Sequence, residues 1–170
     1  MAAKVSSVMS DASDTSDREI IISRVLNAPR ELVFEAWTDP EHLAHWYGPN
    51  GFRTITHEMD VRVGGTWRFI MRGPDGTDYP NRIVFSEVVK PERLVYTHDS
   101  GPEKGEDPHA FFVTVTFADQ GRKTGLTMRS IFRSAAARDH VVREFGAIEG
   151  GKQTLARLEE YLQSKLAQEK

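Results

Sequence analysis

The stretch that decides the fold is residues 39–71, which read DPEHLAHWYGPNGFRTITHEMDVRVGGTWRFIM. From position 55 onward, every second side chain is apolar or aromatic apart from one histidine: Ile55, His57, Met59, Val61 and Val63, then Trp67, Phe69 and Met71. The positions between them are mostly polar, and this period of two is typical of strands with one buried face. We predict two antiparallel strands, 53–63 and 66–72, joined by a tight hairpin at Gly64 and Gly65.

The rest of the chain supplies further strands and a helical end. A β-branched run at 18–26 predicts a first strand, and Pro29 predicts a helix start capped by Asn27 or Ala28. A second short helix begins with Asp39 as N-cap and Pro40 at its first position. Further strands are expected at 81–89, 93–98, 111–117 and 126–132, with a loop at 100–109.

The pattern becomes helical after Ser134, which we expect to cap a helix. From Phe145, apolar residues recur at steps of three and four as far as Leu166, so we predict one long amphipathic helix over 145–166. Two glycines at 150–151 either permit close approach to the sheet or break this helix. Strands joined by short turns pair antiparallel, so we predict an α+β fold whose curved seven-stranded sheet is closed by the last helix.

Composition excludes several classes of protein. At 170 residues the chain fits one domain, and its net charge of −3 provides no basic excess for nucleic acid or an anionic membrane. No cysteine is present, so disulfides and thiolate metal sites are excluded. Residues 1–17 are rich in serine and aspartate and predict a disordered or weakly docked tail, followed by a domain over 18–167. We expect a cytoplasmic protein.

The order and spacing of several motifs resemble the START-like, or SRPBCC, superfamily. The similarity is greatest to the branch named after the C-terminal domain of the activator of heat-shock protein 90 ATPase. The motifs are VLNAPRELVFEAWTDPEHL at 25–43, WYGP at 46–49, GGTWRF at 64–69, GPDG at 73–76 and PERLVY at 91–96. The resemblance covers residues 18–167 and implies a helix-grip fold, in which the sheet wraps the C-terminal helix and leaves an apolar cavity.

Candidate site residues come from the side chains expected to face that cavity. His57 and His98 share the phase of apolar neighbours, where each is a buried histidine, a polar anchor for a ligand or a proton-transfer group. The aromatic side chains are either core or cavity wall. The predicted ligand-binding set is Trp46, His57, Met59, Trp67, Phe69, Phe85, Tyr96, His98 and Phe145.

Motifs for other chemistry are absent from the sequence. There is no G-x-S-x-G, Walker A, G-x-G-x-x-G or H-E-x-x-H pattern, so no catalytic residue and no cofactor is predicted. His42 and His45 lie three residues apart on the second helix, but no third ligand accompanies them, and no metal site is predicted.

Three functions remain open from the sequence. The first is a binding domain for a small hydrophobic or aromatic molecule, with Trp46, Trp67, Phe69 and Phe145 as walls and His57 and Tyr96 as hydrogen-bonding groups. The second is a cyclase- or aromatase-like enzyme in which His57 or His98 relays a proton. The third, motivated by the resemblance alone, is a chaperone-linked interaction module. A homodimer formed through an exposed strand edge or helix is compatible with the sequence.

Overall fold

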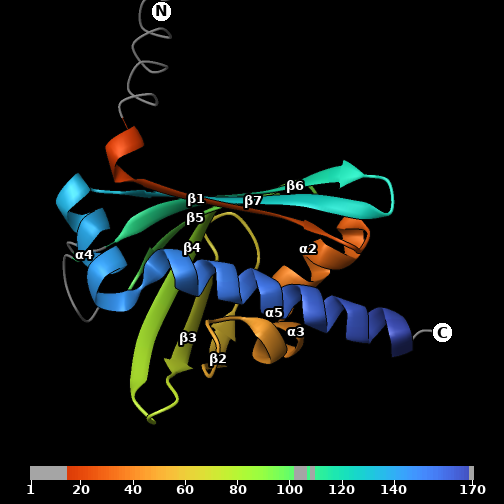
Figure 1. The fold of residues 1–170 in the computed structure, drawn as a ribbon, viewed down its shortest axis with the longest axis horizontal. Helices are drawn as coiled ribbons and strands as arrows, with labels where there is room; N and C mark the ends of the chain where they lie inside the picture. The colour runs from red at the N-terminus through yellow and green to blue at the C-terminus, as the bar shows by residue number, and fades with distance from the viewer. Residues whose placement is uncertain (1–14, 102–106, 108–109, 169–170) are drawn as a thin grey trace, which may run out of the picture.

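The computed structural model describes residues 15–101, 107 and 110–168. A first strand is followed by two short helices, six consecutive strands and two C-terminal helices (Figure 1). The elements are η1 (Ser16–Arg18), β1 (Glu19–Leu26), α2 (Arg30–Thr38), α3 (Pro40–Trp46), β2 (Arg53–Met59), β3 (Thr66–Arg72), β4 (Asp78–Val89), β5 (Arg93–Asp99), β6 (Phe111–Gln120), β7 (Lys123–Phe132), α4 (Ala135–Phe145) and α5 (Ala147–Gln168).

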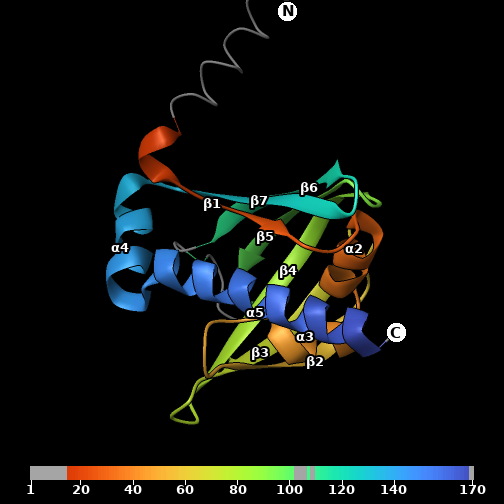
Figure 2. The same cartoon turned by 45° about the vertical axis from the view of Figure 1, so that its right-hand side comes forward.

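The seven strands form one antiparallel sheet in the order β1-β7-β6-β5-β4-β3-β2. Consecutive strands from β2 to β7 are neighbours, and β1 joins at the far side of β7, so β1 and β2 are the two edge strands. The sheet curves around α5, which crosses its concave side (Figures 1 and 2). This arrangement confirms the predicted α+β helix-grip fold.

Two of the predicted helix starts are confirmed by side-chain caps. The Asp39 carboxylate accepts a hydrogen bond from the Glu41 amide at 2.9 Å, with Pro40 in the first turn of α3. Ser134 Oγ accepts from the Ala137 amide at 3.0 Å at the start of α4. The α2 start is different from the prediction: Pro29 itself is the N-cap, with extended backbone and no side-chain cap.

The predicted tight hairpin between β2 and β3 is wrong. β2 ends at Met59, and residues 60–65 form a longer connection in which the Gly64 amide donates to the Phe85 carbonyl at 2.7 Å. Gly65 packs so closely that a Cβ there would lie 2.0 Å from the Asp60 carbonyl oxygen. The two glycines therefore close a loop against β4, and Val63 is exposed on that loop.

The C-terminal helix breaks at Gly146, one residue after its predicted start. Gly146 adopts the left-handed conformation at φ 58°, which glycine reaches without the steric cost of a Cβ, and it separates α4 from α5. Gly150 and Gly151 lie inside α5 and do not break it. A Cβ at Gly151 would lie 2.2 Å from Cδ1 of Ile22, so the close-approach interpretation is the correct one.

The main core lies between the concave face of the sheet and α5. Buried α5 side chains that face it are Thr154, Leu155, Leu158 and Leu162. On the other side of α5, the Arg157 guanidinium donates to the carbonyls of Gly48 and Pro49 at 2.9 and 3.0 Å. These contacts fix α5 against the loop that follows α3.

The N-terminal segment enters β1 through η1. Of the tail predicted over 1–17, residues 1–14 lie outside the described part, whereas Thr15 is buried and bonded to both Glu19 and Arg129. In the predicted loop at 100–109, residues 102–106 and 108–109 are likewise outside the described part. Ser100, Gly101 and Asp107 do not belong to any strand.

Candidate ligand-binding site

Most of the predicted aromatic residues are packed in the core. Trp46 is fully buried, its indole Nε1–H donates to the Ala36 carbonyl at 3.1 Å, and its ring lies 4.9 Å from that of Trp37. Trp67 and Phe69 are stacked at 3.8 Å on β3. Because each is almost completely removed from solvent, their first role is to stabilise the sheet and the helical pair above it.

Phe85 and Tyr96 face each other across β4 and β5 on the concave side, with ring centroids 6.0 Å apart. Both are buried. Burial raises the pKa of the Tyr96 hydroxyl well above its usual value, and neighbouring Tyr47 adds to the effect, so the hydroxyl stays protonated at physiological pH.

The prediction that His57 faces the interior is wrong, because β2 contains a β-bulge at that residue. Thr56 opposes Phe69 and Glu58 opposes Arg68, so His57 is an extra residue between two regular pairs and its side chain is exposed. The bulge shifts the phase of the strand. Thr54 is therefore buried, and the Thr56 hydroxyl accepts from the Trp67 indole at 3.0 Å.

Met59, which follows the bulge, does face inward and packs against the core. It opposes Trp67 in the register of β2 and β3. Of the two residues predicted to face inward, the bulge therefore places His57 outside, whereas Met59 faces the core as predicted. Ile55, before the bulge, opposes Ile70 on the other face.

The prediction that Phe145 lines the interior is also wrong. Phe145 is the last residue of α4 and is 64% exposed, with its ring 5.8 Å from His140. The prediction assumed that Phe145 and the later leucines lie on one continuous helix. Because Gly146 changes the direction of the chain, Phe145 does not share their face.

His98 is the predicted residue whose surroundings best fit a binding site. It lies on β5 opposite Ile83 and Phe111, on the concave face, and is half-buried. Its ring is 4.8 Å from that of Phe111 and 6.0 Å from that of Phe69. An imidazole is therefore held among apolar rings while still reaching solvent.

The partner of His98 fixes which imidazole nitrogen carries the proton. Nε2 lies 2.8 Å from Oδ1 of Asn81, and the Asn81 amide nitrogen donates to the Tyr79 carbonyl at 2.8 Å. With the amide oriented in this way, its oxygen can only accept, so Nε2 of His98 is the donor. In the neutral ring, Nδ1 then remains as a hydrogen-bond acceptor.

Burial also determines the charge of His98. It lowers the pKa of the imidazole to about 4, against the opposing influence of the Asp99 and Asp107 carboxylates. His98 is consequently neutral at physiological pH. His98 therefore acts as a neutral hydrogen-bonding group whose ring is fixed by Asn81 and lies beside the rings of Phe69 and Phe111.

Two further residues of this site were missed by the sequence analysis. Asn81 opposes Phe69, and Phe111 opposes both His98 and Phe132, with the Phe111 and Phe132 rings stacked at 4.7 Å. Asn81 precedes Ile83 and Phe85 at steps of two, so extending the alternation of β4 toward its N-terminus would have identified it. We call His98, Asn81, Phe69 and Phe111 the His98 cluster.

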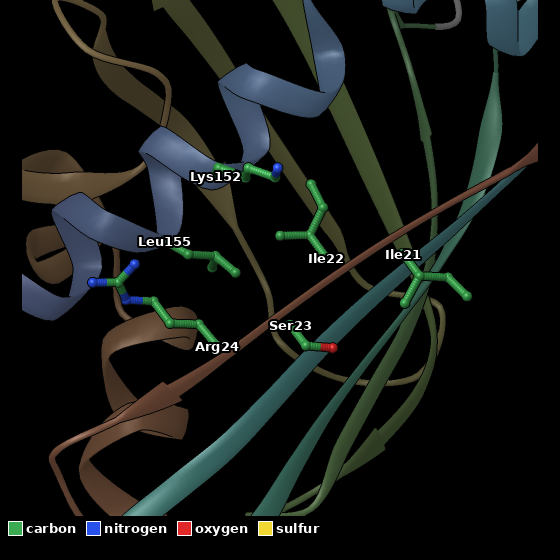
Figure 3. A pocket seen from close by; sticks show the side chains of 6 residues that line it. All are labelled: Ile21, Ile22, Ser23, Arg24, Lys152 and Leu155. Carbon is green, nitrogen blue, oxygen red and sulfur yellow. The ribbon is translucent and has the colours of Figure 1, made fainter.

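Two pockets lie away from the His98 cluster, beside edge strand β1. One has a volume of about 270 Å³ and is lined by Ile21, Ile22, Ser23, Arg24, Lys152 and Leu155 (Figure 3). The other, of about 380 Å³, lies near the β6–β7 end and is lined by Ser23, Arg24, Val25, Ala118, Gln120, Gly125, Leu126 and Thr127. None of the nine predicted site residues lines either pocket.

The histidines of α3 pack against α5. The His42 ring is hydrogen-bonded through Nδ1 to the Tyr161 hydroxyl, and its Nε2 lies 3.3 Å from Oε1 of Glu35. His45 stacks on Tyr161 at 5.2 Å. Across residues 15–101, 107 and 110–168, no group of three or more potential ligands is arranged to hold a metal ion.

None of the helices in the described part of the chain is both long and apolar enough to cross a membrane. This agrees with the amphipathic character of α5, whose buried residues occupy one side.

Comparison with solved structures finds the same fold in several bacterial proteins. A protein from Arthrobacter aurescens, solved by NMR, is 24% identical with a TM-score of 0.80, and the match covers 88% of each chain. Protein NE0264 from Nitrosomonas europaea is 25% identical with a TM-score of 0.76, over 88% of this chain and 97% of that one. Protein Ms6760 from Mycobacterium smegmatis is 22% identical with a TM-score of 0.79, over 89% and 94%.

No curated protein matches the chain. The sequence profile described as "Activator of Hsp90 ATPase homolog 1-like protein" matches residues 27–163, which span α2, α3, all strands of the sheet except β1, α4 and most of α5. The chain therefore belongs to the Activator of Hsp90 ATPase homolog 1-like family, within the START-like, or SRPBCC, superfamily.

Proposed function

We propose that this protein binds a small hydrophobic or aromatic molecule that carries a hydrogen-bond donor, on the concave side of the sheet at the His98 cluster. The observation that carries the proposal is the half-buried imidazole of His98, held between the rings of Phe69 and Phe111. Small-molecule sites are typically apolar surfaces with a few fixed polar groups, and the cluster has this composition.

The aromatic rings would supply most of the contact area. Phe111 is half-buried, so its ring can cover a ligand, whereas Phe69 is buried and supports the ring system from below. Of the other predicted residues, Met59, Trp67, Phe85 and Tyr96 belong to the supporting core, and Trp46, the last residue of α3, packs in the same core against Trp37 of α2. His57 and Phe145 are not part of the proposed site.

The polar selectivity would come from His98 Nδ1. The bond from Nε2 to Asn81 fixes the ring and leaves Nδ1 as an acceptor, so a ligand hydroxyl or amine can donate to it. Ligands that lack a donor would leave this nitrogen without its hydrogen bond, and they would bind more weakly for that reason.

The same electrostatics favour binding over proton transfer. A general base works best when its pKa is near the operating pH, and burial lowers that of His98 to about 4. His57, the other histidine considered for such a relay, is exposed on the bulge of β2. We therefore infer a binding domain as the main function, and a cyclase-like reaction through these histidines has less support.

The test compares two probes that differ by one hydroxyl group, 2-naphthol and naphthalene. Binding is measured by quenching of tryptophan emission and by NMR shifts of the His98 ring. We expect 2-naphthol to bind roughly fivefold more tightly, because one hydrogen bond contributes about 1 kcal/mol. His98→Leu should remove this preference, while naphthalene binding should persist.

His57→Leu is the matched control, since it makes the same replacement at an exposed position. It should leave both affinities unchanged. If neither probe binds, or if His98→Leu and His57→Leu behave alike, the His98 cluster is not the site. Native mass spectrometry of freshly purified protein would identify any molecule that is retained.

A further inference from the structure

We propose that the free edge of β1 is a docking site for an extended peptide segment that runs parallel to β1 and has the pattern apolar–acidic–x–x–apolar. This site is separate from the His98 cluster. It consists of the backbone of residues 21–25 together with Lys152 and Leu155 of α5.

The first observation is that β1 pairs with a strand on one side only. Its neighbour is β7, and its pairing over Glu19–Leu26 is regular. In a regular strand, the backbone N–H and C=O groups of alternate residues point to the same side. Once one residue of β1 is known to point its backbone groups away from β7, every second residue from it points the same way.

Both ends of the free edge are closed by side chains, which identifies those residues. The Arg138 guanidinium donates to the Glu19 carbonyl at 3.0 Å. At the other end, the backbone N–H of Asn27 donates to the Glu159 carboxylate at 3.2 Å, and the backbone carbonyl of Asn27 accepts from the Gln163 side chain at 2.9 Å. Residues 19 and 27 thus point to the free edge, and the alternation assigns Ile21, Ser23 and Val25 to the same edge.

The middle of the edge is open. The pocket of about 270 Å³ is lined by four consecutive β1 residues, Ile21 to Arg24, whose side chains alternate between the two faces of the sheet. A pocket that touches both faces of one strand lies along its edge. Figure 3 shows Lys152 and Leu155 extending from α5 toward Ile22 on this side of β1.

The side chains around the edge define what an added strand should carry. Ile21 and Val25 are 59% and 54% exposed on the outer face, so apolar residues opposite them would cover both. On the inner face, Lys152 makes no ion pair among the described residues, whereas Arg24 lies 3.7 Å from Glu159. An acidic side chain opposite Ile22 would reach the Lys152 ammonium.

Charge selects such a peptide over a second copy of this chain. An antiparallel pair of β1 strands centred on Ser23 would place Arg24 of one copy opposite Ile22 of the other. That arrangement would bring the Arg24 guanidinium toward Lys152 of the other copy, and two like charges held close together repel each other. Peptide addition to a sheet edge uses main-chain hydrogen bonds for affinity and alternate side chains for specificity.

The test is a selection from a randomised library of eight-residue linear peptides on the full-length protein. Enrichment of the apolar–acidic–x–x–apolar pattern is the expected result. The best enriched peptide is then added to 15N-labelled protein, where the amides of Ile21, Ser23 and Val25 should shift and become protected from hydrogen exchange. Lys152→Glu should weaken binding at least tenfold, and replacing the peptide's acidic residue by lysine should restore binding to that variant.

Two further variants separate the backbone from the charge. Ser23→Pro removes an edge amide that the sheet does not use, which an edge strand tolerates, and it should abolish binding without a large change in melting temperature. Lys90→Glu changes the net charge equally at the exposed β4–β5 turn and should have no effect.

The proposal is overturned if no pattern is enriched, if the shifted amides lie elsewhere, or if Lys152→Glu and Lys90→Glu bind the peptide equally. It is also overturned if the free protein self-associates through β1, which would be seen as a concentration-dependent protection of the same three amides.

Discussion

A Cβ atom at Gly151 would lie 2.2 Å from Cδ1 of Ile22, so α5 and β1 meet at a position that has no room for a side chain on the helix. Ile22 is buried, and the same added Cβ would lie 3.9 Å from Cε of Met128. Gly151→Ala gains about 1 kcal/mol of helix propensity but overpacks this contact, which costs ~1–3 kcal/mol. We expect a net loss of stability of about 1 kcal/mol by urea unfolding.

Gly150 provides the matched control for this prediction. A Cβ there would meet only Pro49, at 3.5 Å, which is an ordinary contact. Gly150→Ala should therefore stabilise the protein by about 0.5–1 kcal/mol. In an Ile22→Val background, where Cδ1 is absent, Gly151→Ala should become neutral or stabilising; equal effects in both backgrounds would contradict the contact.

The lowered pKa of His98 predicts a dependence of stability on pH. The unfolded chain binds a proton at this residue near pH 6.5, whereas the folded protein binds it only near pH 4. Between these values the unfolded state holds more protons, so the free energy of unfolding rises with pH. We expect a slope on the order of 1 kcal/mol per pH unit from this group.

His98→Gln should flatten the unfolding curve between pH 5 and 6.5, measured by urea titration at several pH values. This range lies above the titration of most carboxylates. His57→Gln, at an exposed position, is the control and should keep the slope of the parent protein. A parent protein whose stability is constant across this range would contradict the burial of neutral His98.

The fold was predictable because its signals are local. Turn sequences mark the ends of strands, and the caps at Asp39 and Ser134 mark the starts of two helices. The apolar stripe of the last helix likewise identifies that helix without knowledge of the other elements. The order of such elements then restricts the topology to an antiparallel sheet closed by a helix. The one long-range strand pairing, β1 beside β7, has no such local signal, and the sequence did not predict it.

The site was less predictable because it depends on single-residue irregularities. The alternation around His57 is regular in sequence, and nothing in it indicates that the strand inserts an extra residue there. Gly146 is likewise one glycine among several, but its left-handed backbone directs Phe145 away from the core. In both cases a change of one residue in phase moves a side chain from the interior to solvent.

The hydroxyl of Tyr161 links α5 to α3 through His42, and we expect this bond to contribute to stability. His42 Nε2 faces the Glu35 carboxylate at 3.3 Å, which can only accept, so Nδ1 accepts from Tyr161 in the neutral ring. Tyr161→Phe should cost about 1 kcal/mol in urea unfolding. Tyr79→Phe, at a residue that is 41% exposed, should be close to neutral, and equal losses would argue against the bond.

Arg157 is expected to be the most sensitive polar residue of α5. Its Nη1 donates to three backbone carbonyls, those of Gly48, Pro49 and Phe52, at 2.9, 3.0 and 3.2 Å. Desolvation lowers the pKa of the guanidinium, as expected for a charge held against the protein surface. Lysine keeps the charge but not the planar donor group, so the three carbonyls would lose their shared partner.

We therefore expect Arg157→Lys to destabilise the protein by about 1–2 kcal/mol, because hydrogen bonds to charged groups contribute more than neutral ones. Hydrogen exchange of the amides between residues 48 and 53 should accelerate, since this loop would no longer be fixed to α5. Arg143→Lys makes the same replacement at an exposed position of α4 and should change neither quantity. If Arg157→Lys leaves the exchange of the loop unchanged, contacts such as that of Gly150 with Pro49 are sufficient to hold it, and the guanidinium is not the anchor.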